Sequence, residues 1–225
     1  NITAQIPDFS KVQKLPVIMR VNSNIFDKTF KLDDRIQVGV EGARQMKAYF
    51  DIGDFKKNIY LHEKEPGIYI GSYTVKQNDF ASNEQLVIHL ESETKGKSPW
   101  PEMDNLISID GIPPDKPVSF KAETALDQVL LSWNIKNTDY AYFIISKSPE
   151  PSPDSSPDPS KNYKIISKTS DLKLIDKDIK QGETYFYRIS TVDKAGNISE
   201  PLMEGPVIIP FTKPVVLKKE LSGKL

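Results

Sequence analysis

The chain has 225 residues, of which 38% are hydrophobic and 27% are charged, a composition typical of folded globular domains. Its 30 basic and 31 acidic residues give a net charge of −1, which provides no concentrated basic surface for nucleic acid. Cysteine is absent, which excludes disulfides, thiolate metal ligands and a cysteine nucleophile. No stretch approaches the ~20 apolar residues that a membrane-spanning helix needs.

The first half of the chain alternates apolar and polar residues over several short runs, after a lead-in segment at 1–14 without any period. A first strand is expected at residues 15–21. One residue in two then falls on a shared face in each of five runs: Ile36, Val38 and Val40; Met46, Ala48, Phe50 and Ile52; Ile59 and Leu61; Tyr69, Tyr73 and Val75; Leu86, Ile88 and Leu90. Runs spaced by roughly 10 residues, with turn residues between them, indicate a β-sandwich.

Two polar stretches of this half, residues 23–34 and 91–104, are expected to be loops. Residues 106–109 are the last predicted strand of a first domain at 15–110. The following sequence DGIPPDKP has three prolines, which restrict the backbone and favour an extended, stiff segment. We therefore expect residues 111–117 to link the first domain to a second one at 118–211 and to set the two end to end.

The second half also reads as short strands. Val129, Leu131, Trp133 and Ile135 alternate along one strand, and further strands are expected at 140–146, 163–166, 172–174 and 207–211. Residues 148–160 are rich in Pro, Ser and Asp and have almost nothing to bury, so a mobile loop is predicted. Residues 212–225 form a tail with four lysines.

The stretch TYFYRISTVDKAGNISEP, residues 184–201, organises the second half. Tyr185, Tyr187 and Ile189 alternate with more polar residues, the period of a β-strand. Residues 193–197, DKAGN, are then predicted to form a turn. Asp and Asn side chains hydrogen-bond to nearby backbone, and Gly readily adopts positive φ.

These motifs resemble the fibronectin type III domain in its bacterial form, over about residues 113–211. The matching stretches are the prolines at the entry, VLLSWNI around Trp133, IKQGETYFYRI and VDKAGNISEP. The resemblance implies that Trp133 packs in the core, that Ile179 stands where the family has Leu, and that Tyr187 is structural. It also implies a tyrosine corner, with the Tyr185 ring buried and its hydroxyl bonded to backbone near residues 179–181.

The first half resembles bacterial immunoglobulin-like modules, through AYFDIG at 48–53 and PGIYIGSYTV at 66–75. The predicted fold class is therefore all-β, with two tandem β-sandwich domains. The resemblance implies an exported protein of the cell surface, the periplasm or the extracellular space, and a start at Asn1 rather than Met leads us to expect a processed or trimmed product. It implies no reaction, because such sandwiches are scaffolds for unrelated functions.

Candidate ligand sites are few. His62 and His89 both alternate with core residues, and we interpret them as solvent-facing strand residues rather than metal ligands. Asp33, Asp34 and the pair Asn78-Asp79 could together bind calcium at a sandwich end, although Asp and Asn are also ordinary turn residues. No cofactor is otherwise expected.

Two segments are candidates for partner contact. Trp100 lies between two prolines, where its ring could stack on a sugar or a protein surface, or could instead cover the domain junction. Val215, Val216 and Leu217 give the tail some capacity to pair with the open sheet edge of a partner, although the tail could equally be an exit linker.

Two functions follow from these observations. The first is a non-catalytic structural or adhesion module of the bacterial envelope, a rigid two-domain spacer or assembly subunit whose partners are other protein subunits. The alternative is a carbohydrate-binding accessory region of a secreted enzyme that acts on polysaccharide, which requires several exposed aromatic rings on one face.

Overall fold

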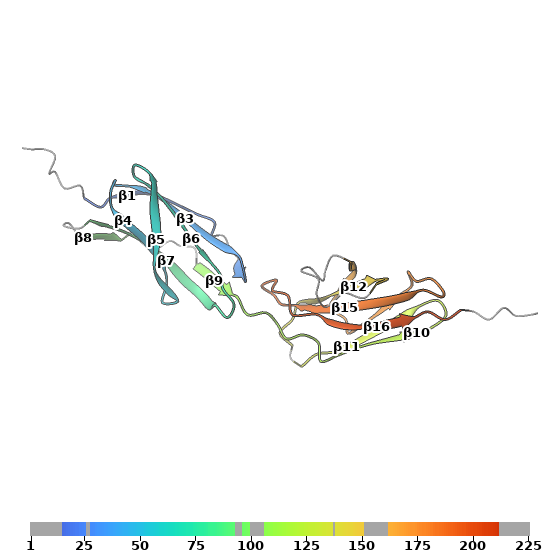
Figure 1. Cartoon of the computed structure of the whole chain (residues 1–225). Coiled ribbons are helices and arrows are strands. Elements are labelled where there is room, and N and C mark those ends of the chain that lie inside the picture. Colours follow the sequence, from blue (N-terminus) through green and yellow to red (C-terminus); the bar gives the residue numbers. More distant parts are fainter. Residues whose placement is uncertain are drawn as a thin grey trace, which may run out of the picture. The chain divides into compact units, whose positions relative to one another are not determined.

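A computed structural model of the chain describes residues 15–25, 28–92, 96–99, 106–136, 138–150 and 162–211. The chain divides into two compact units, Asn1–Pro113 and Pro114–Leu225, so the boundary falls within the proline-rich stretch. All regular structure in the described ranges is β-strand, which confirms the predicted all-β class (Figure 1). None of the described residues form a helix that could cross a membrane.

The first unit is one folded sheet. Its described residues form nine strands: β1 (Ile18–Ser23), β2 (Thr29–Lys31), β3 (Arg35–Gly42), β4 (Lys47–Ile52), β5 (Lys56–Glu65), β6 (Ile68–Thr74), β7 (Phe80–Ser92), β8 (Gly96–Pro99) and β9 (Leu106–Asp110). Hydrogen bonds join them in the order β1-β3-β6-β5-β4-β7-β9-β2, with β8 added to β7. The β2–β9 pair is parallel, and the other described pairs are antiparallel.

Two long strands turn this sheet into a sandwich. β5 pairs with β4 up to Leu61 and with β6 from His62 onward. β7 pairs with β9 over residues 80–85 and with β4 over residues 86–91. The apolar side chains that alternate along the strands therefore meet in one buried core, whose fully covered members include Ile36, Phe50 and Ile88.

Two strands lie where loops were expected, so those two predictions are wrong. β2 falls within residues 23–34 and buries Phe30 completely. β8 falls within residues 91–104 and pairs in antiparallel register with the end of β7. Each strand has three or four residues, which is too short for the alternation of apolar and polar residues to be visible in the sequence.

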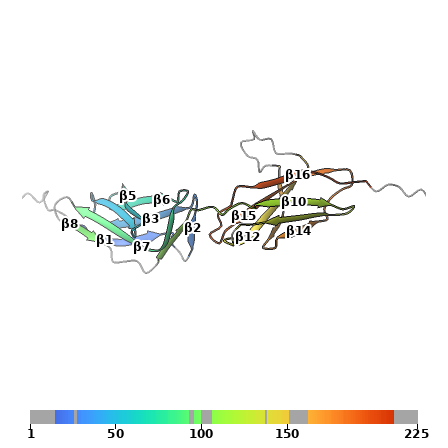
Figure 2. The same cartoon turned by 90° about the horizontal axis from the view of Figure 1, so that it is seen from below.

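The second unit is a sandwich of two separate sheets (Figure 2). Its described strands are β10 (Ser119–Thr124), β11 (Val129–Asn134), β12 (Tyr142–Ser148), β13 (Lys164–Thr169), β14 (Lys173–Asp176), β15 (Thr184–Val192) and β16 (Leu202–Ile208). One sheet has the order β10-β11-β14 and the other β13-β12-β15-β16. β16 begins five residues before the predicted strand at 207–211. The core between the sheets includes Leu131, Phe143 and Ile189.

The turn after β15 has the chemistry that its sequence predicts. The Asp193 carboxylate accepts hydrogen bonds from the backbone N–H groups of Gly196 at 2.7 Å and Asn197 at 2.8 Å. Gly196 has φ of 91°, a conformation that side chains disfavour. The turn thereby redirects the chain from β15 toward β16.

Candidate functional site

The residues expected to be structural lie in the core of the second unit. Trp133 is buried, with the rings of Phe120 and Phe143 at centroid distances of 6.2 and 5.5 Å. Ile179 is partly buried against the same cluster. Tyr187 is fully buried. These side chains hold the two sheets together, so they are unavailable to a ligand.

Tyr185 forms the arrangement that the resemblance implies. Its ring is buried, and its hydroxyl accepts a hydrogen bond from the Lys180 backbone N–H at 3.1 Å. The same hydroxyl donates to Glu183 Oε2 at 2.6 Å. Burial, and then the bond to Glu183, raise the pKa of Tyr185 to about 12, while that bond lowers the pKa of Glu183.

A buried polar network beside this corner was missed by sequence reasoning. Asp176 Oδ2 lies 3.0 Å from Lys147 Nζ and accepts a hydrogen bond from the Tyr187 hydroxyl at 2.8 Å. Burial and the Asp176 carboxylate both raise the pKa of Tyr187. Because Asp176 ends β14 while Lys147 and Tyr187 lie on β12 and β15, the network ties one sheet to the other. Its members satisfy one another, which indicates a structural role.

The two histidines differ from each other, and the interpretation of His89 as solvent-facing is wrong. His62 is exposed on β5. His89 is largely covered, since its ring stacks on Tyr49 at 4.6 Å and its Nε2 lies 3.0 Å from Asp51 Oδ2. Asp51 and His89 are adjacent because β4 and β7 pair in antiparallel register, which sequence spacing does not reveal.

Two of the four residues considered for calcium, Asp34 and Asp79, have protein partners for their carboxylates. Asp34 Oδ2 accepts from the Lys31 backbone N–H, and Asp79 Oδ2 accepts from the Tyr73 hydroxyl at 2.6 Å and the Lys76 N–H at 2.7 Å. Among the described residues, no group of three or more His, Asp or Glu side chains is arranged to hold a metal ion.

The predicted contact residues Trp100, Val215, Val216 and Leu217 lie outside the described residues.

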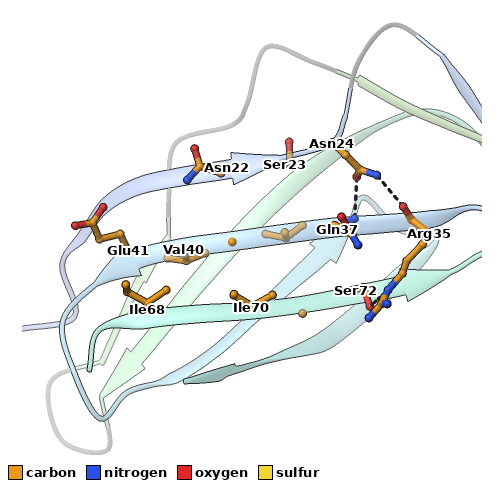
Figure 3. Close-up of a pocket in the computed structure, with 13 residues that line it drawn as sticks. Asn22, Ser23, Asn24, Arg35, Gln37, Val40, Glu41, Ile68, Ile70 and Ser72 are labelled. Atoms are coloured by element: carbon orange, nitrogen blue, oxygen red, sulfur yellow. Dashed lines mark hydrogen bonds between the residues drawn. The ribbon is translucent and has the colours of Figure 1, made fainter. Parts of the chain in front are cut away.

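A groove of about 530 Å³ lies on the outer face of β1, β3 and β6 (Figure 3). Cross-strand pairing sets its floor, with Gly39 of β3 between Asn22 of β1 and Ile70 of β6. Ile70 is 49% exposed and its neighbour Ile68 is 38% exposed. Two adjacent exposed isoleucines beside a residue without a side chain form an apolar hollow, a common feature of recognition surfaces.

Gly39 is not required by the fold. A Cβ at this position would lie 3.9 Å from its nearest neighbours, the backbone oxygens of Asn22 and Tyr69, which is ordinary contact. By contrast, a Cβ on Gly71 of β6 would lie 2.6 Å from the Tyr60 backbone oxygen, so close approach of β5 requires that glycine. Because residue 39 is glycine, the surface has a depression there, although the packing of the strands does not require a glycine at this position.

Polar groups border the hollow. Asn24 fixes the end of β1 by accepting from the Gln37 N–H and donating to the Arg35 carbonyl, both at 2.8 Å. Arg35 Nε donates to Ser72 Oγ at 2.8 Å, which orients the guanidinium across β6 (Figure 3). The exposed amides of Asn22 and Gln37 can each donate and accept hydrogen bonds. Sequence reasoning missed the groove, because only strand register brings its residues together.

No protein-family model matches the chain, and no curated protein matches it. Several solved structures resemble parts of the chain or most of it. The A168–A170 domains of titin are 13% identical, with a TM-score of 0.50, over 87% of this chain and 68% of that one. The FN1–FN3 domains of chicken CNTN1 are 12% identical, with a TM-score of 0.48, over 83% and 65% of the two chains. The fibronectin(III)-like modules of Clostridium thermocellum CbhA are 10% identical, with a TM-score of 0.45, over 82% and 91%.

At these identities the likeness shows the fold alone. The chain has the β-sandwich fold of fibronectin type III and immunoglobulin-like domains, as its motifs predict.

Proposed function

We propose that the chain is a non-catalytic structural module of an exported bacterial protein that acts as a spacer or assembly subunit through protein–protein contacts. The groove over Gly39 carries this proposal, because its exposed isoleucines and hollowed floor are suited to receive a side chain of another protein. The sandwich fold supports it as a stable scaffold on which such a surface is displayed. The proline-rich linker at 111–117 supports the spacer role.

The composition of the groove favours a protein partner over a polysaccharide. Sugar rings stack on flat aromatic side chains, whereas the residues that line this groove are isoleucine, valine, glycine and polar residues. Aliphatic side chains and amides instead match the apolar side chains and backbone amides of a polypeptide.

Photo-cross-linking in the native cells tests the proposal. A photoreactive amino acid replaces Gln37 at the groove or, as a control, the exposed Lys121 on β10 of the second unit. We expect a discrete protein adduct from position 37 and none from position 121. A glycan adduct from position 37, or hydrolysis of a polysaccharide by the purified chain, would overturn the proposal.

A further inference from the structure

The groove has a direction along β3. Arg35 lies at one end and Glu41 at the other, with Gln37 and Gly39 between them on the same outer face (Figure 3). Antiparallel pairing sets Ser72 beside Gln37, Ile70 beside Gly39 and Ile68 beside Glu41. The surface therefore passes from cationic, through polar and apolar, to anionic.

Both charges at the ends of the groove are available to a partner. Arg35 is exposed, and within the described part of the chain its guanidinium bonds Ser72 through Nε, which leaves the terminal nitrogens as donors for a partner. Glu41 lies 3.9 Å from Arg20 Nε, and the two side chains are 47% and 69% exposed. Such an exposed pair is weak, so Glu41 can exchange Arg20 for a partner's cation.

The spacing fits an extended peptide. Arg35 and Glu41 are six residues apart on a strand, which is roughly 20 Å at about 3.4 Å per residue. A second extended chain of seven residues covers the same length and turns every other side chain toward the sheet. Four of its side chains then face Arg35, Gln37, Gly39 and Glu41 in turn.

We propose that the groove binds an extended segment of a protein partner that carries an acidic, a polar, an apolar and a basic residue at alternate positions. The acidic residue faces Arg35, the apolar residue fills the hollow between Gly39 and Ile70, and the basic residue faces Glu41. The partner's backbone bonds the amide of Asn22. This inference rests on the proposed function and adds the chemistry and direction of the partner.

Two capped heptapeptides probe this chemistry by titration into the ¹⁵N-labelled full chain, followed by NMR. The first has the sequence Glu-Thr-Ser-Thr-Ile-Thr-Lys, and the second exchanges its two charged ends. Bound in the same direction as the first peptide, the second places like charges opposite Arg35 and Glu41. Bound in the reverse direction, it matches both charges but places serine instead of isoleucine at the hollow. We expect shifts of the Gly39 and Ile70 amides and at least tenfold tighter binding of the first peptide.

Charge exchange on the protein gives the matched control. The double variant Arg35→Glu/Glu41→Arg is expected to reverse the preference, so that the second peptide binds at least tenfold tighter. Gly39→Val is expected to weaken binding of the first peptide at least tenfold, because the added side chain takes up space in the hollow. The melting temperature should not fall, because a Cβ at this position meets its neighbours only at ordinary contact distance and valine favours β-strands.

Equal binding of both peptides, an unreversed preference in the double variant, or shifts confined to other surfaces would overturn the inference. If position 37 still gives a protein adduct in cells, the proposed function stands and only the chemistry of the partner is wrong. If no protein adduct forms there, the proposed function fails with it.

Discussion

At the scale of single residues, Gly71 is needed for the packing of neighbouring strands, whereas Gly39 only shapes the surface. In Gly71→Ala the new Cβ would meet the Tyr60 carbonyl oxygen at 2.6 Å, and strands β5 and β6 would have to move apart. We expect this substitution to lower the free energy of unfolding by about 2 kcal/mol, the usual scale for overpacking. Gly39→Ala should instead raise it by about 0.5 kcal/mol, because alanine loses less backbone freedom on folding. Urea denaturation of both variants measures the difference, and equal losses would contradict the assignment of Gly39 to the surface.

The Tyr185 hydroxyl should make stability depend on alkaline pH. Its pKa is about 12 in the folded chain, against about 10 for an unperturbed tyrosine. The unfolded chain therefore releases this proton first, and its contribution to stability is complete below pH ~10 and is lost as the pH rises through ~12.

Tyr185→Phe should remove part of that dependence. At neutral pH we expect a loss of about 1 kcal/mol, because the Lys180 N–H and the Glu183 carboxylate lose their shared partner. Between pH ~10 and ~12 the stability of the variant should fall less steeply than that of the original chain. Denaturation at a series of pH values checks this, and parallel curves would show that Tyr185 does not titrate in this window.

At the scale of elements, one tyrosine secures the connection between β3 and β4. The Tyr69 hydroxyl donates to the Ala43 carbonyl at 2.7 Å and accepts from the Met46 N–H at 3.0 Å, and the ring itself is buried. Tyr69→Phe should cost about 1 to 3 kcal/mol, since two backbone groups are left without their partner. Amide exchange should quicken at Met46. Tyr60→Phe on exposed β5 is the control, and an equal loss there would refute the role of the hydroxyl.

How far elements could be predicted from the sequence depended on their length and on whether one face was buried. β3, β4 and β11 alternate over six residues or more, so their inward residues could be read directly. β2 and β8 are too short to show a period. The pairing of Asp51 with His89 and of Lys147 with Asp176 depends on register and on sheet packing, which no local spacing encodes. The groove over Gly39 was hidden for the same reason.

At the scale of the whole molecule, the two units have separate cores. The cluster around Phe50 and Ile88 and the cluster around Trp133 and Phe143 share no residue. The fold of both units matched what the motifs implied, because turn residues and alternating strands are local signals. The proposed partner surface lies on the first unit, so substitutions in the groove should leave the second unit folded.

The most direct measurement of the central claim is the yield of the protein adduct from position 37 in chains with and without Gly39→Val. The added side chain fills the hollow while a Cβ there meets its neighbours only at ordinary contact distance, so folding should be unaffected. A module that binds through this groove should lose at least nine tenths of the adduct, with a melting temperature that is not lowered. An unchanged yield would show that the partner of this protein does not bind there.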